Sequence, residues 1–178
     1  DNPTGSGGPG QPDWLATGVH DPGITILDLM TFPILEGQTI FQDQLVAPGR
    51  LERGAALQPG PTDTTLLAAI QPGSNDTFVA YSYASPGGPV LTRSNLAAGT
   101  EFVAVRFYNQ PLVQVLFYVP GQSNVLVQPL VNGDGGLELG ASTVTTFAAA
   151  VEQVYALDEG TNGVAVIRFG DGVVSGLR

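Results

Sequence analysis

The sequence predicts an all-β protein: two related small β-barrel or sandwich modules preceded by an extended N-terminal arm. Three observations lead to this fold class, namely short strand-like runs, frequent turn residues and an ordered internal duplication. The 24 Gly and 14 Pro are about a fifth of the 178 residues, which is typical of short strands joined by turns. Because 43% of the residues are apolar and fall into regular runs, we expect a folded core.

The N-terminal segment predicts an extended arm over residues 1–23. Its first 13 residues contain four Gly and three Pro, and no large apolar side chain precedes Trp14. Such a segment cannot build a core by itself, so we expect it to lie on a neighbouring molecule or across its own domain. Trp14 is the candidate partner-contact residue, since tryptophan buries a large area. A disordered tail, with Trp14 capping the core, is the alternative.

Short β-branched or aromatic runs predict the strands of the body. Turn residues such as Pro48-Gly49, Pro72-Gly73, Pro120-Gly121 and Asp171-Gly172 bound nearly all of them, as in a sandwich or barrel. The expected strands are 24–27, 39–41, 77–81, 102–105, 113–119, 124–127 and 163–167. Residues 64–70 and 145–156 are rich in Ala and lack a 3.6-residue stripe, so a short helix or a strand fits either.

Four sequence blocks recur in the same order, at an offset between 81 and 86 residues, which indicates an internal duplication. Gly37-Gln38-Thr39 recurs as Gly121-Gln122-Ser123, and Leu51-Glu52-Arg53-Gly54-Ala55 recurs as Leu137-Glu138-Leu139-Gly140-Ala141. Gln44-Leu45-Val46 and the Thr/Ala-rich segment 62–70 recur at 128–131 and 143–151. We therefore expect a first β module at 24–84, a β linker at 85–115 and a second β module at 116–178.

This order of elements resembles the small β-barrel, β-tulip-like head decoration (cement) proteins of tailed phages. The resemblance covers the arm and both modules and is one of pattern, without a signature residue; the chain departs from it by carrying two modules. It implies a Gly-rich arm that runs over the capsid lattice, here the residues up to Trp14. It also implies a mechanical role, in which the protein bridges capsomers and stiffens the shell against the pressure of the DNA.

The chain offers few residues for catalysis, and we expect no catalytic site and no enzyme activity. His20 is the one histidine and is followed by Asp21, a pair that can orient an imidazole, but Asp21-Pro22-Gly23 predicts a β-turn there. No Gly-x-Ser-x-Gly motif occurs. Glu52 and Glu138 occupy equivalent repeat positions, which fits a structural duty better than one asymmetric acid–base site.

Metal and cofactor sites are also not expected. With no Cys and one His, no thiolate or His-based zinc site is available within one chain. Asn132-Gly133-Asp134-Gly135-Gly136 offers oxygen ligands for calcium, yet a hairpin turn explains it as well. Asp158-Glu159-Gly160 is more consistent with a solvated turn, and the Gly-rich stretches lack the lysine of a phosphate-binding loop.

The net charge and the hydropathy of the chain limit the kinds of partner that it is expected to bind. The formal charge of −10, from 16 acids and six Arg, opposes nucleic-acid binding, which needs cations. No apolar run reaches the length of about 18 residues that spans a bilayer. The resemblance to head decoration proteins implies a virion structural protein on the capsid surface, bound to the major capsid protein and to copies of itself. The alternative is a cell-surface β-rich lipoprotein or an extracellular fibre subunit.

Overall fold

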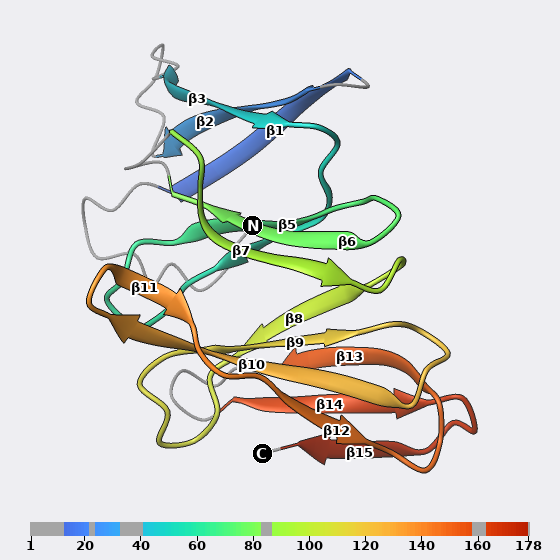
Figure 1. The fold of residues 1–178 in the computed structure, drawn as a ribbon. Coiled ribbons are helices and arrows are strands. Elements are labelled where there is room, and N and C mark those ends of the chain that lie inside the picture. The colour runs from blue at the N-terminus through green and yellow to red at the C-terminus, as the bar shows by residue number, and fades with distance from the viewer. Residues whose placement is uncertain (1–12, 22–23, 33–40, 83–86, 158–162, 178) are drawn as a thin grey trace. The chain divides into compact units, whose positions relative to one another are not determined.

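The computed structural model describes residues 13–21, 24–32, 41–82, 87–157 and 163–177, and these form strands and turns (Figure 1). No helix occurs within these ranges, so the all-β prediction is confirmed. The chain divides into two compact units, residues 1–50 and 51–178.

The first unit contains an antiparallel sheet of three strands in the order β1-β2-β3. The strands are β1 (Asp13–Asp21), β2 (Ile24–Phe32) and β3 (Phe41–Pro48). Pairing of β1 with β2 begins with Asp21 opposite Ile24, and Pro22 and Gly23 of the predicted β-turn lie outside the described residues. The predicted arm is thus a paired strand from Asp13 to Asp21, whereas residues 1–12 lie outside the described part of the chain.

The second unit consists of three antiparallel sheets. The first has the order β4-β5-β6-β7, the second the order β11-β10-β9-β8 with β12 also paired to β10, and the third the order β13-β14-β15. The bounds are β4 (Glu52–Leu57), β5 (Leu66–Gln71), β6 (Asp76–Tyr81), β7 (Pro89–Leu96), β8 (Glu101–Val105), β9 (Gln114–Tyr118), β10 (Asn124–Gly133), β11 (Gly136–Leu139), β12 (Thr143–Thr146), β13 (Val151–Leu157), β14 (Val164–Phe169) and β15 (Val174–Leu177).

Strands β8, β9 and β10 lie between the other two sheets of this unit and contribute buried side chains to a core on each face (Figure 1). Along β9, Val115 and Phe117 pack in the core shared with the β4–β7 sheet, while Leu116 and Tyr118 pack in the core shared with the β13–β15 sheet. Successive side chains of a strand point to opposite faces. A strand buried on both sides therefore reads as a continuous apolar run, as residues 113–119 do.

Along one of its edges, the long strand β10 pairs with two different strands. Its residues 124–127 pair with β12, and its residues 130–133 pair with β11. Gln128 and Pro129 lie at the change of partner, opposite the three residues 140–142, so the register shifts by one residue there. The side chain of Gln128 fills this irregularity, because its amide Nε2 donates to the carbonyl oxygen of Gly140.

The boundaries of the structural units differ from those of the predicted modules and linker. Residues 85–115 are no separate linker, because they supply β7 to one sheet and β8 to the next, and Leu91, Leu96 and Phe102 are buried there. The predicted first module is split, since β2 and β3 belong to the first unit and β4 to β6 to the second.

The duplicated blocks differ in strand pairing. The segment with Leu51-Glu52 forms β4, which pairs forward with β5, whereas the equivalent Leu137-Glu138 lies in β11 and pairs back with β10. The Ala-rich segments, for which helix or strand was open, are strands in both copies: 64–70 contributes to β5, and 145–156 to β12 and β13. Similar local sequences thus occur in two different topologies.

Candidate functional site

The sequence-predicted site residues lie in separate places. Trp14 is in β1 at the register position opposite Thr31, and His20 is opposite Thr25 near the other end of the same strand pair. Asp158-Glu159-Gly160 falls outside the described residues. The role of Trp14 as a partner anchor therefore stays a prediction.

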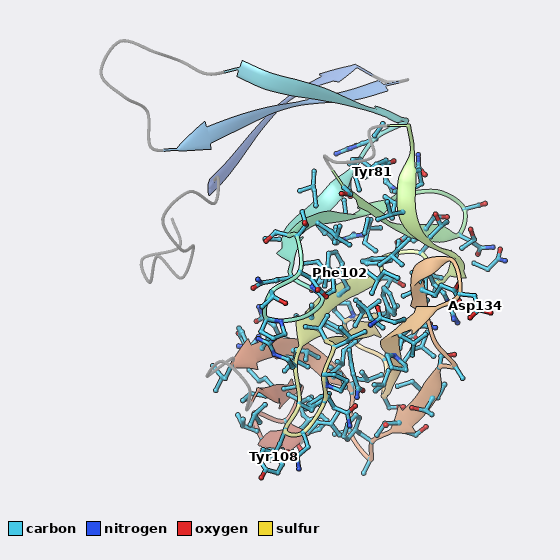
Figure 2. The ribbon with its side chains drawn as sticks, turned by 90° about the vertical axis from the view of Figure 1, so that its left-hand side faces the viewer. Tyr81, Phe102, Tyr108 and Asp134 are labelled. Carbon is cyan, nitrogen blue, oxygen red and sulfur yellow. The ribbon has the colours of Figure 1, made fainter. Side chains whose placement is uncertain are left out.

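The Asn132–Gly136 segment forms the predicted hairpin turn. Gly133 pairs with Gly136, so Asp134 and Gly135 are the two connecting residues, and Gly136 has a φ of 115° that only glycine adopts readily. Asp134 lies at the tip of this hairpin (Figure 2). No group of three or more His, Cys, Asp or Glu that could hold a metal ion occurs in the described ranges.

Asp76 is the centre of a buried polar cluster that sequence reasoning missed. It is 2% exposed, and its carboxylate accepts hydrogen bonds from Thr100 N–H (3.0 Å, Oδ2) and from Gly73 N–H (3.3 Å, Oδ1). Arg53 Nη1 lies 3.6 Å from Asp76 Oδ2 and donates to the Thr100 carbonyl oxygen at 3.0 Å. The cluster thus joins β4, the turn before β6 and the start of β8.

Arg53 reaches this cluster from an unusual backbone position. Its φ is 52°, in the left-handed region that non-glycine residues seldom occupy, and it lies where the β4–β5 register shifts. The Leu-Glu-Arg-Gly segment carries no local signal of this position, because the partners of Arg53, Asp76 and Thr100, are distant in the sequence.

A second polar contact connects two sheets. Arg93 Nη1 of β7 donates to Gln128 Oε1 of β10 at 2.5 Å, and Gln128 is 2% exposed. A buried amide without hydrogen-bond partners lowers the stability of the folded state. This pair therefore fixes how β7 and β10 meet.

Tyr118 and Glu101 form the third polar pair, across strands β8 and β9. Tyr118 Oη donates to Glu101 Oε2 at 2.6 Å, and the two residues are direct register partners. Burial raises the pKa of Tyr118 to about 12, and the hydrogen bond to Glu101 adds to this shift, while a backbone hydrogen bond from Val154 acts in the opposite direction.

Raising the pH from 10 to 12 is expected to destabilise the protein through Tyr118. The folded pKa of about 12 lies above the ordinary value of 10, so folding favours the neutral phenol. This contribution is fully present below pH 10 and is lost as the pH rises through about 12. Denaturant unfolding of the wild type and of Tyr118→Phe between pH 8 and 12 measures it.

The Tyr118→Phe variant is expected to lose stability less steeply over this range than the wild type. Tyr81, whose pKa burial also raises, is present in both proteins and so cancels in the comparison. Equal slopes in the two proteins would contradict the assignment.

The outward side of the β13–β15 sheet is the candidate interaction surface. Ala165, Ile167 and Phe169 of β14 pack in the core, so the alternate positions Val164, Val166 and Arg168 share the opposite face. Their register partners on β13 and β15 share that face. We call the apolar positions of this side the outer face: Tyr155, Leu157, Val164, Val166 and Val174.

Three residues of the outer face are exposed although they are apolar, and Val164 and Val166 are half-buried. Tyr155 is 42% exposed, Leu157 57% and Val174 59%. Gly176 of β15 stands opposite Val166 and adds no side chain over it. A solvated antiparallel sheet normally presents polar residues on its open side, so this apolar row is a candidate contact surface.

Two further features border the outer face. At one end, Arg168 and Glu152 form an ion pair at 3.3 Å, with about half of each side chain exposed. At the other, Phe107 bridges to Gly163, the residue before Val164, and the next residue, Tyr108, is 68% exposed at a turn (Figure 2). The outer face therefore carries a paired charge at one end and a free aromatic ring beside the other, as at the rim of a protein interface.

Comparisons with known proteins do not assign this chain to a family. No family model, no curated protein and no solved structure matches the chain. Among the described residues, no helix is both long and apolar enough to cross a membrane.

Proposed function

We propose that this protein is a virion structural protein that decorates the outside of a capsid, where it binds the major capsid protein and further copies of itself. The pattern resemblance to phage head decoration proteins and the all-β architecture support this proposal. The observation that carries it is the outer face, an exposed apolar row with Tyr155, Leu157 and Val174 on a sheet at the outside of a three-sheet stack.

The chemistry of the outer face favours a protein partner. Aromatic and aliphatic side chains on a firm sheet are typical centres of protein interfaces. The sheet below them is held by a core that contains Val154, Ile167 and Phe169, so the row is presented in one geometry. A net charge of −10 opposes a phosphate-rich partner.

The small size of the outer face fits a repeating lattice. Five apolar positions on three short strands bury far less than the roughly 800 Å² per partner of a standard interface. One such contact is weak, but many copies on a shell, each also held by a second contact, are retained through multivalency. Decoration of a capsid provides this arrangement.

Val174→Asp is expected to reduce binding to capsids at least tenfold, because it places a charge in the apolar row. The assay mixes the purified chain with undecorated shells of the virus that encodes it and measures occupancy by co-sedimentation over a range of concentrations. Val144→Asp is the matched control, since Val144 is 63% exposed, is also a valine on a short strand, and lies outside the outer face. We expect this control to bind as the wild type does.

Two outcomes would overturn the proposal. One is a wild-type chain that does not bind shells at micromolar concentration, and the other is equal binding by Val174→Asp and the wild type. Recovery of the protein with cell envelopes instead of particles would support the cell-surface alternative.

A further inference from the structure

The boundary between the two units coincides with the first arginine of the sequence. The first unit ends at Arg50 and the second begins at Leu51. Residues 1–49 contain neither Lys nor Arg, and all six basic residues of the chain are Arg. The first bond that an arginine-specific protease can recognise is therefore the bond that joins the two units.

The backbone at this boundary is a loop of the kind that proteases cut. Arg50 is exposed and lies outside any strand, after β3 ends at Pro48 and before β4 begins at Glu52. Gly49 has a φ of 83°, so the chain turns directly before Arg50. Exposed loops at domain boundaries that contain Pro and Gly are the preferred sites of proteolytic nicking.

Arg53, three residues further along, is held by the folded second unit. Its Nη1 donates to the Thr100 carbonyl oxygen at 3.0 Å and lies 3.6 Å from Asp76 Oδ2. A protease of the trypsin class binds the arginine of the cleaved bond in an acidic pocket. Arg53 can enter such a pocket only after it leaves Asp76 and Thr100, so the contacts of β4 protect the bond that follows it.

The other arginines in the described part of the chain are also held within the second unit. Arg93 lies in β7 and donates to Gln128 Oε1 at 2.5 Å, and Arg106 is 8% exposed. Arg168 lies in β14, the central strand of its sheet, and forms an ion pair. Cleavage at these residues needs a strand to separate from its neighbours or a buried side chain to leave the core. The loop at the unit boundary requires neither change.

We propose that the Arg50–Leu51 bond is a processing site for an arginine-specific serine protease of the trypsin class. Hydrolysis of this peptide bond consumes one water and leaves a carboxylate on Arg50 and an amine on Leu51. The second unit stays folded after the cut, because both of its cores consist of residues that follow Leu51. The contacts of Arg53 with Asp76 and Thr100 hold the new N-terminal end of β4 in place.

Limited digestion of the folded chain with trypsin tests this site. We expect one early cut that gives a fragment beginning at Leu51, identified by N-terminal sequencing and intact mass. Arg50→Gln should slow this cut at least about a hundredfold, because the charged pocket of the protease is left without a partner, and Arg50→Lys should restore it. Arg168→Gln is the matched control, since the Arg168 side chain is 48% exposed, and it should be cut after Arg50 as the wild type is.

The fragment that begins at Leu51 is expected to keep its β circular dichroism and a cooperative denaturant transition. A globally unfolded chain exposes all of its arginines together and is cut at several of them at once. Accumulation of the single-cut product therefore shows that trypsin cuts the folded protein.

The proposal is overturned if trypsin leaves the folded chain intact, or if the bond after Arg53, Arg93 or Arg168 is cut before the bond after Arg50. It is also overturned if Arg50→Gln releases the first unit as fast as the wild type, or if the fragment that begins at Leu51 is unfolded. Because each measurement is made without capsids, its result is separate from that of the decoration assay.

Discussion

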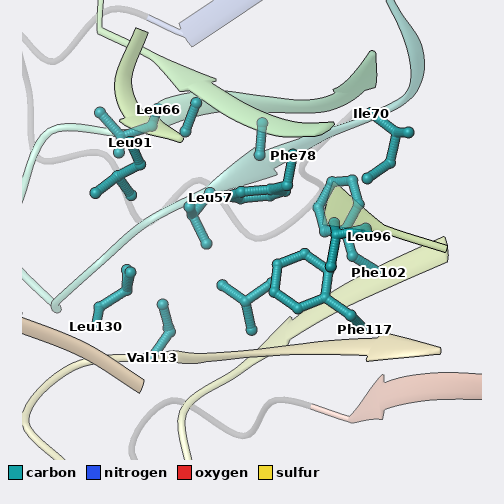
Figure 3. Close-up of a cluster of buried hydrophobic side chains, with 13 residues drawn as sticks. Leu57, Leu66, Ile70, Phe78, Leu91, Leu96, Phe102, Val113, Phe117 and Leu130 are labelled. Carbon is teal, nitrogen blue, oxygen red and sulfur yellow. The ribbon is translucent and has the colours of Figure 1, made fainter. Parts of the chain in front are cut away.

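Phe78→Ala is expected to lower the free energy of unfolding by about 3–5 kcal/mol, the usual cost of removing a fully buried aromatic ring. Phe78 of β6 is 0% exposed. Its ring lies 5.1 Å from those of Phe102 and Phe117, with interplanar angles of 77°, so it meets both edge to face (Figure 3). The loss therefore weakens the contact between the β4–β7 and β8–β12 sheets.

Denaturant unfolding monitored by circular dichroism measures this effect. Tyr108→Ala removes an aromatic ring that is 68% exposed, and should change the unfolding free energy by less than about 0.5 kcal/mol. If Phe78→Ala is too unstable to purify, Phe78→Leu is expected to cost about 1–2 kcal/mol. A cost below 1 kcal/mol for Phe78→Ala would show that this core is not packed as described.

Asp76→Asn is expected to cost about 2–3 kcal/mol, because hydrogen bonds to a buried charged group are stronger than neutral ones. The carboxylate accepts from the N–H groups of Thr100 and Gly73 with different oxygens, and the asparagine amide has only one acceptor oxygen. One N–H then faces an NH₂ group, and Arg53 loses its ionic partner in the cluster.

Asp171→Asn is the matched control for this substitution. Asp171 Oδ1 also accepts from a backbone N–H in a turn, that of Val173 at 3.0 Å, but the residue is exposed. Water replaces the lost interaction there, so the expected change is within about 0.5 kcal/mol. Equal effects at the two positions would mean that the Asp76 cluster is open to solvent.

The strands were predictable because their signal is local. Residues 77–81, 102–105, 113–119 and 124–127 are β-branched or aromatic runs bounded by turn residues, and each forms a strand. The Asp134-Gly135 hairpin was predictable for the same reason. The segments 64–70 and 145–156 were ambiguous, since alanine favours helix, and pairing with neighbouring strands decided them.

The repeat predicted a shared topology that the structure does not have. Local sequence specifies a strand but not its neighbour, which depends on distant residues. The polar contacts of Asp76 with Thr100 and of Gln128 with Arg93 join residues 24 and 35 positions apart, so no spacing rule reveals them.

From its order of residues alone, this chain is recognisable as β-structured and acidic, with turns at Gly, Pro and Asp, because each of these properties belongs to a residue and its near neighbours. The packing of the sheets decides which apolar faces are covered. Val166 and Ile167 are alike in sequence, yet Ile167 is buried and Val166 lies on the outer face. A strand turns successive side chains to opposite sides, and among the described residues of the second unit only one side of the β13–β15 sheet packs in a core.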